Sequence, residues 1–207
     1  MASRRAWPVT TFRLVVLGAG IAPAIWLLWQ WLSGSLGANP PEAVVHFTGL
    51  TGLTLLMVTI GFSPAFRLIK WPGIMIARRQ MGLWAFFWLL AHMVAWMGLD
   101  QYWDWPWIMR DMMNLAYVRY GLAALILLLP LALTSFKRVQ QRMGPGAWHW
   151  LHRLIYVAAA LGVTHFWILT RADYLLPTLY ASALCGLVLF RLIDAFMHRQ
   201  EKISRNG

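Results

Sequence analysis

Long apolar stretches, separated by short polar or Pro/Gly-containing segments, follow one another along the whole chain. Six of them cover residues 14–32, 43–66, 81–99, 120–135, 150–169 and 174–190, approximately. A helix rises 1.5 Å per residue, so about 20 apolar residues cross a hydrocarbon core ~30 Å thick. No lysine or arginine falls in the middle of a stretch. The pattern predicts an all-α membrane protein of six transmembrane helices, in one domain over residues 1–207.

The composition agrees with a membrane environment. The chain of 207 residues is 60% hydrophobic and 12% charged, and it holds 14 tryptophans, whereas a soluble domain of this size carries far more charge. The net charge of +11 could suit nucleic acid, but the basic residues are scattered between apolar stretches instead of gathered on one domain. We therefore expect contact with membrane lipid and no nucleic-acid partner.

Charged residues are divided unevenly between the two ends of the predicted helices. With the N-terminus inside, fifteen of the eighteen lysines and arginines lie on the inner side, and only Arg110, Arg119 and Arg171 lie outside with five of the seven acids. The positive-inside rule then predicts that both termini are cytoplasmic. The longest outer loop is expected at residues 100–119. It contains three tryptophans at positions 103, 105 and 107, which suit either the lipid headgroup layer or a docking platform for an external partner.

Two histidines lie alone in the outer halves of apolar stretches, where an ionisable side chain is costly and by default functional. His92 is 8 residues before Asp100 and His165 is 6 before Arg171, so both lie about 9 to 12 Å deep at helical rise. With one cysteine, Cys185, the chain has no thiolate pair and no covalent haem motif, and a metal must be held by histidine. Two imidazoles at matched depth favour axial ligation of b-type haem; a proton relay or structural hydrogen bonds are the alternatives.

Ligation of haem by facing helices also requires small neighbours one turn away from each histidine. In the fifth stretch Ala158 and Gly162 share a face with His165. In the third stretch a comparable stripe is expected from Ala85, Trp88, His92 and Ala95.

His152 lies 13 residues before His165, which places it ~20 Å nearer the inner side and about 220° around the helix. Opposite it the third stretch offers Arg78 and Arg79, whose guanidinium groups do not ligate iron. One haem is therefore expected, and a second is left open. The two arginines could hold haem propionates or a flavin phosphate, or simply anchor the helix at the inner surface.

The other histidines are less informative. His46 opens the second stretch at its outer end and is a candidate interfacial residue, quinone hydrogen-bond partner or haem-propionate partner. His149, in the interfacial Trp148-His149-Trp150, and His198, in the basic C-terminal segment, are expected to have no role in binding a cofactor.

Several short motifs together resemble one family nearly end to end. They are Leu36-Gly37-Ala38-Asn39-Pro40, His46-Phe47-Thr48-Gly49, Arg78-Arg79, Gly82-Leu83-Trp84, His92, Leu133-Thr134-Ser135, Trp148 with Leu151-His152 and Tyr156, and His165. The chain resembles the haem-binding membrane subunits of bacterial periplasmic methionine sulfoxide reductase systems, the MsrQ family (formerly YedZ), within the ferric-reductase-like transmembrane group. The resemblance implies a ferric-reductase-like haem-binding bundle in which His92, His152 and His165 are the haem-associated histidines.

The resemblance also implies a function in the bacterial inner membrane. Members of the family hold haem b, with FMN as a reported companion, and pass electrons from the quinone pool to a periplasmic molybdenum-cofactor enzyme that repairs methionine sulfoxide. A cytosolic flavin reductase is an alternative donor. We expect the sulfoxide chemistry in the partner, since this chain has no reactive-thiol pair. Two other functions stay open, another quinone-linked cytochrome b anchor and a haem-free proton-coupled transporter.

Overall fold

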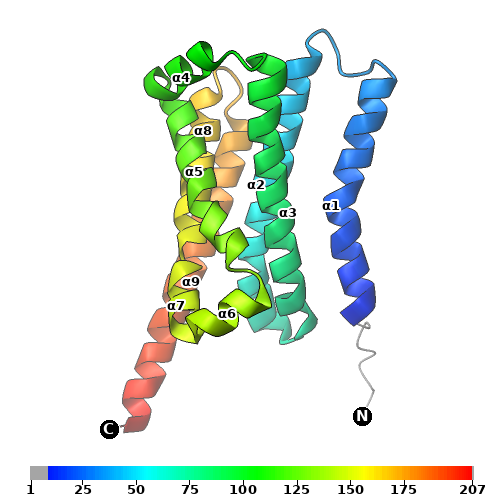
Figure 1. The fold of residues 1–207 in the computed structure, drawn as a ribbon. Coiled ribbons are helices and arrows are strands. Elements are labelled where there is room, and N and C mark those ends of the chain that lie inside the picture. Colours follow the sequence, from blue (N-terminus) through cyan, green and yellow to red (C-terminus); the bar gives the residue numbers. More distant parts are fainter. Residues whose placement is uncertain (1–8, 207) are drawn as a thin grey trace.

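Six membrane-length helices make up the body of the protein. The computed structural model describes residues 9–206. Within them, six helices are long and apolar enough to cross a membrane, and these are Thr10–Leu32, Pro40–Ile69, Gly73–Asp100, Ala116–Leu133, Pro145–Leu169 and Leu175–Met197. The predicted all-α architecture of six spans is therefore confirmed. The first span begins and the last one ends at the same end of the bundle (Figure 1).

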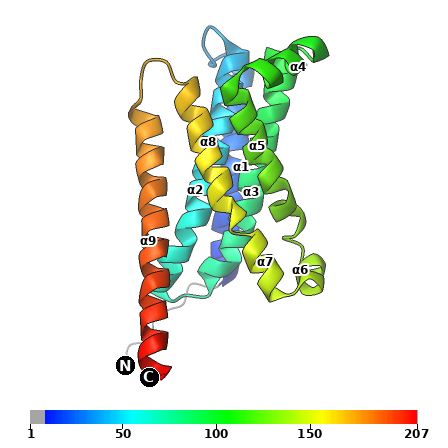
Figure 2. The same cartoon turned by 90° about the vertical axis from the view of Figure 1, so that its left-hand side faces the viewer.

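The helices are joined by short connections and follow one another up and down the bundle (Figures 1 and 2). Their bounds are α1 Val9–Leu32, α2 Pro40–Ile69, α3 Gly73–Ala95, a π-helical turn η1 Trp96–Asp100, α4 Trp105–Asn114, α5 Ala116–Leu133, α6 Lys137–Met143, α7 Pro145–Leu151, α8 Leu154–Leu169 and α9 Leu175–Asn206. We call the end that carries α4 the α4 end, and the end that carries α6 the α6 end.

Local capping explains where α2 begins and ends. The side chain of Asn39 accepts a hydrogen bond from the backbone N–H of Glu42, and Pro40 takes the first helical position, where its missing N–H costs nothing. At the other end Lys70 adopts the left-handed conformation, with φ of 55°, and its N–H bonds to the carbonyl of Phe66. The polar residues at both ends of the helix thus extend it beyond the apolar stretch 43–66.

The segment after α3 differs from the prediction of a plain loop. It contains α4, whose first turn is capped by the Asp104 carboxylate accepting from the N–H of Trp107 at 3.3 Å. The next span begins at Ala116, so Arg119 lies inside α5 and not in the loop. An apolar-stretch criterion misses both features, because a capped amphipathic helix and an arginine near a helix end interrupt hydropathy without interrupting backbone hydrogen bonding.

Two antiparallel helix pairs, α2 with α3 and α5 with α8, form the centre of the bundle. Side chains from both pairs meet in one apolar core that includes Leu56, Ile60, Ala158 and Ala159. Helix α1 stands at one edge of the bundle and packs mainly on α3 (Figure 1). At that contact the indole N–H of Trp88 donates to the carbonyl of Gly20 at 2.9 Å, and a Cβ on Gly20 would lie 2.2 Å from the Trp84 ring.

Candidate functional site

A cavity of about 720 Å³ lies between the central helices and opens toward the α4 end. Its walls are mostly leucines and other apolar side chains of α2, α5 and α8, including Leu53, Leu125 and Leu128. From the wall formed by α8, Ala158 and Gly162 reach the cavity together with His165, as the sequence predicted. The volume is within the range of cofactor-binding cavities, about 300 to 1,000 Å³.

The expected small-residue stripe on α3 does not line the cavity. Ala85 is fully buried in the core, and Trp88 points toward α1, where it bonds Gly20. His92 instead reaches the cavity beside Leu89, Met93 and Trp96. The prediction was wrong because several faces of α3 are covered by neighbouring helices, and only tertiary packing decides which of them meets the cavity.

His92 on α3 and His165 on α8 both line this cavity and face one another. Their ring centroids are 6.0 Å apart, with the rings at 78°. These two residues are 73 positions apart in the sequence, so only the packing of α3 and α8 around the cavity brings them together.

Each imidazole is held by a backbone carbonyl of a neighbouring helix. Nδ1 of His92 lies 2.8 Å from the carbonyl oxygen of Val45, and Nδ1 of His165 lies 2.7 Å from that of Tyr117. A carbonyl oxygen only accepts hydrogen bonds, so Nδ1 carries the proton in both rings. In the neutral imidazole Nε2 is then left with a free lone pair, as in a metal-binding histidine whose other nitrogen is held by a carbonyl.

Two glycines make these close approaches feasible. A Cβ on Gly49 would lie 2.9 Å from Nδ1 of His92, and a Cβ on Gly121 would lie 2.9 Å from Nδ1 of His165. Each glycine follows the accepting residue by four positions, so it lies one turn away on the same face of its helix. Gly49 belongs to the motif His46-Phe47-Thr48-Gly49, but the sequence alone does not predict its contact with His92. It gives no signal at all for the contact of Gly121 with His165.

These residues fit a haem. Nitrogen ligands bind a metal at about 2 Å, so two opposed imidazoles on one iron have ring centres on the order of 6 Å apart, which agrees with the 6.0 Å between these rings. The apolar walls suit a porphyrin, and the small residues of α8 leave space beside the histidine. The arrangement can therefore supply two neutral imidazole ligands in a mostly apolar cavity.

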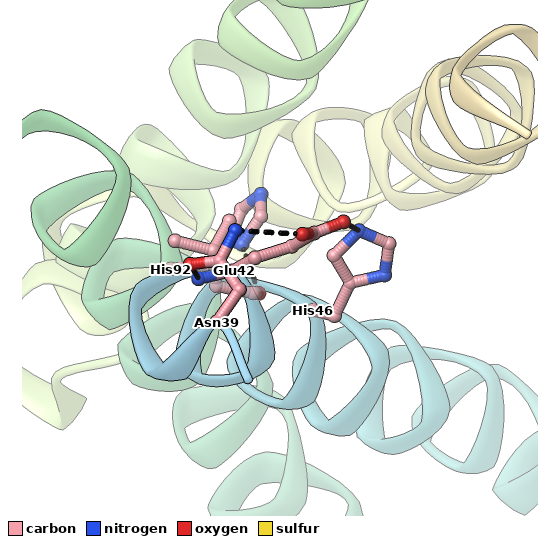
Figure 3. A network of polar contacts seen from close by, with 5 residues as sticks. Asn39, Glu42, His46 and His92 are labelled. Atoms are coloured by element: carbon pink, nitrogen blue, oxygen red, sulfur yellow. Dashed lines mark hydrogen bonds and ion pairs between the residues drawn. The ribbon is translucent and has the colours of Figure 1, made fainter. Parts of the chain in front are cut away.

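The mouth of the cavity is polar and acidic. Glu42, Asp100 and Asp173 line it together with Asn39 and His46. Figure 3 shows Glu42 between Asn39, whose amide donates to it at 2.9 Å, and His46, whose Nε2 is 4.0 Å from the carboxylate. The His46 side chain is 57% exposed. The structure thus places His46 at the mouth, apart from the two central imidazoles.

The predicted inner residues gather at the α6 end, away from the cavity. His152 lies at the break between α7 and α8, where its Nδ1 is 3.0 Å from the carbonyl of Trp148 and its ring stacks on that indole at 3.9 Å. Arg78 is within electrostatic reach of His152, and Arg79 is exposed. The described residues offer no second histidine facing His152. His149 bonds the carbonyl of Pro145, and the side chain of His198 lies outside the described residues.

Comparisons with known proteins agree on one family. The family model of the ferric reductase like transmembrane component matches residues 48–163. Three relatives are named protein-methionine-sulfoxide reductase heme-binding subunit MsrQ. The protein of Caulobacter vibrioides is 38% identical over 84% of this chain and 83% of its own length. That of Rhodospirillum rubrum is 39% identical over 91% and 90%, and that of Deinococcus radiodurans is 39% identical over 86% and 87%.

Proposed function

The chain belongs to the ferric-reductase-like transmembrane family and, within it, to the MsrQ heme-binding subunits, and from this premise we propose how its residues hold haem and carry electrons. A protein of this family with six apolar spans is a membrane electron-transfer subunit of a methionine sulfoxide reductase system.

The observation that carries the proposal is the pair of neighbouring imidazoles that line one mostly apolar cavity, each with its Nδ1 on a backbone carbonyl and its Nε2 outside that bond. We propose that His92 and His165 would hold haem b through their imidazoles. The carbonyls of Val45 and Tyr117 keep Nδ1 protonated, which directs each lone pair toward the cavity and raises the basicity of the ligand. A haem held by these residues would supply reversible one-electron transfer. The surrounding leucines exclude water, which tunes the reduction potential.

The proposed path runs from quinol in the membrane to a periplasmic molybdenum-cofactor catalytic subunit, where the sulfoxide is reduced. The residues that line the cavity lie toward the α4 end, so it is suited to deliver electrons on that side of the membrane. His46 has a ring nitrogen at the mouth that could bond a quinone or a haem propionate, with Glu42 as its neighbour. Lipid-soluble quinol remains the primary donor in this proposal, and a cytosolic flavin reductase is the alternative.

At the α6 end we propose a role for the cationic residues in binding an anionic group. Arg78 is within electrostatic reach of Tyr156 and Arg191, and the Arg191 guanidinium lies 5.6 Å from the Tyr156 ring. Paired guanidinium groups bind phosphate or carboxylate through charge-assisted hydrogen bonds. Arg78, with Arg79 beside it, could thus hold a flavin phosphate, as FMN would provide, or a propionate of a second haem near His152.

We further propose that both termini are cytoplasmic and that the protein lies in the bacterial inner membrane. The segments of the α6 end carry most of the basic residues, and such segments resist translocation. A reporter that is active only outside the cytoplasm is expected to work when inserted near Asp104 and to fail near Lys70 or Arg138. One active reporter in either of the latter segments would refute this orientation.

Visible spectroscopy of the purified protein tests the central proposal. We expect the dithionite-reduced protein to show the sharp bands of b-type haem, with one haem per chain, because one facing histidine pair is present among the described residues. A quinol should reduce this haem, and the periplasmic catalytic subunit with a sulfoxide substrate should reoxidise it. Absence of haem bands from fully inserted protein would exclude an electron-transfer function and leave the proton-relay alternative.

The same measurements assign His152. Its ring stacks on Trp148 at the opposite end from the cavity, so His152→Ala should keep the central haem. If His152 positions an inner cofactor on the electron-entry path, the same change should slow reduction of the haem by quinol several-fold. His149→Ala, which changes an exposed neighbour on α7, is the matched control and should leave the rate unchanged. Two haems per wild-type chain, falling to one in His152→Ala, would show that His152 is an iron ligand instead.

A further inference from the structure

Three carboxylates from separate segments surround the mouth of the cavity. Glu42 lies in the first turn of α2, Asp100 ends η1, and Asp173 precedes α9. All three line the same cavity that holds the two histidines, and all three are exposed. We call these three residues the acidic rim. These are three of the chain's 7 acidic residues, and they lie on the side that the charge distribution predicts to be outer.

No ion pair with a lysine or arginine is formed by the acidic rim among the described residues, and the basic residue nearest to it in sequence is Arg171, two positions before Asp173. Among the described residues, none of those lining the cavity is a lysine or arginine. Glu42 interacts with Asn39 and lies 4.0 Å from His46. Asp100 accepts from its neighbour Gln101, and Asp173 accepts from the backbone N–H of Leu175. These contacts leave most of each carboxylate available to solvent, and therefore to a partner.

We propose that the acidic rim is the docking surface for a basic face of the soluble protein that accepts the electrons. This inference rests on the proposed function and names the surface that serves it. Two observations support a partner at this place. The rim is acidic while the rest of the chain is basic, and the cavity behind it contains His92 and His165 with their free Nε2 atoms. A partner seated on the rim lies over the direct path to the two imidazoles.

The negative charge of the acidic rim favours a protein over membrane lipid as its binding partner. Carboxylates repel the anionic headgroups of bacterial membranes, whereas they attract lysines and arginines of a protein surface. Helix α4 contributes Met112 to the same cavity, and its Trp105 and Trp107 are 58% and 52% exposed, with the Arg110 guanidinium 4.6 Å from the Trp107 ring. Aromatic side chains bordering a charged patch are typical of protein interfaces. Complementary charge of this kind mainly accelerates association, by about 10- to 1,000-fold at low ionic strength, and salt removes the effect.

The test measures how fast the reduced haem is reoxidised by oxidants of opposite charge. The probes are the cation tris(phenanthroline)cobalt(III), the anion ferricyanide, and the purified periplasmic catalytic subunit. In the triple variant Glu42→Gln/Asp100→Asn/Asp173→Asn we expect the cationic probe and the catalytic subunit to react about tenfold more slowly at low salt, and ferricyanide to react faster. These differences should vanish near ~0.5 M salt, where the screening length is only a few ångströms.

A matched pair of single variants separates the rim from general surface charge. Asp173→Asn and Asp104→Asn each remove one negative charge from the α4 end, and each asparagine can still accept from the backbone N–H that the aspartate caps. Only Asp173 lines the cavity. We therefore expect a slower reaction with the catalytic subunit for Asp173→Asn and a rate near that of the wild type for Asp104→Asn.

The outcomes also separate this inference from the proposed function. If the wild type holds haem and reduces the catalytic subunit, but the triple variant reacts at the same rate at every salt concentration, the docking surface lies elsewhere. If the triple variant instead changes only its affinity for vesicles of anionic lipid, the rim faces the membrane and the inference is wrong. Unchanged haem bands in the triple variant are required in each case and show that the cavity has remained intact.

Discussion

Replacing His92 or His165 with alanine is expected to remove nearly all haem from the purified protein while the chain remains inserted in the membrane. Each change deletes one of the two imidazoles that we assign to the haem iron, and the walls next to the pair are mostly apolar. The helices themselves should persist, because their insertion depends on apolar length and not on one imidazole. The measurement is the reduced-minus-oxidised spectrum, normalised to inserted protein.

Two controls make this result specific to ligation. His149→Ala, on the exposed part of α7, should leave the spectrum unchanged. His92→Gly supplemented with free imidazole should regain a large part of the haem bands, because the small ligand can occupy the space left by the side chain. Normal haem content in His92→Ala or His165→Ala would mean that the facing pair does not hold the iron.

Adding one methyl group at Gly49 should have the second largest effect. The Cβ of alanine would lie 2.9 Å from Nδ1 of His92, so the ring must shift and weaken its hydrogen bond to the Val45 carbonyl. Overpacking of this kind costs about 1 to 3 kcal/mol, which corresponds to about 5- to 150-fold weaker haem retention. Gly121→Ala should act in the same way on His165, where the approach is also 2.9 Å.

The matched control lies on the same helix. A Cβ on Gly61 meets nothing within 4 Å, so Gly61→Ala adds the same methyl group to α2 without touching a histidine. The haem affinity of each variant can be followed by transfer of haem to an apoprotein scavenger, together with the midpoint potential. Equal haem loss from the Gly49→Ala and Gly61→Ala proteins would attribute the effect to α2 in general and not to the position of His92.

Hydropathy identified the six spans because the membrane constraint acts locally. Backbone groups in hydrocarbon must be satisfied inside the segment, so about 20 apolar residues between polar ends imply a helix wherever they occur. Helix ends were less accurate. Helix ends are capped by polar residues such as Asn39, Asp104 and Lys70, which satisfy backbone groups there. Because these residues are polar, a search for apolar stretches assigns them to loops.

The sequence alone also identified His92 and His165 as candidate haem ligands. An ionisable side chain in an apolar stretch is rare, and the two histidines are predicted at similar depths in the membrane. The sequence could not show that Gly49 and Gly121 accommodate them, that α3 uses Leu89 and Met93 instead of Ala85 and Trp88 at the cavity, or that three distant acids share one mouth. These features bring together residues far apart in the sequence, such as His165 and Tyr117, which lie 48 positions apart and share a hydrogen bond. Composition and spacing along one helix determine its length and its polar positions, whereas its rotation and its neighbours are set by packing against other helices, which only the tertiary structure contains.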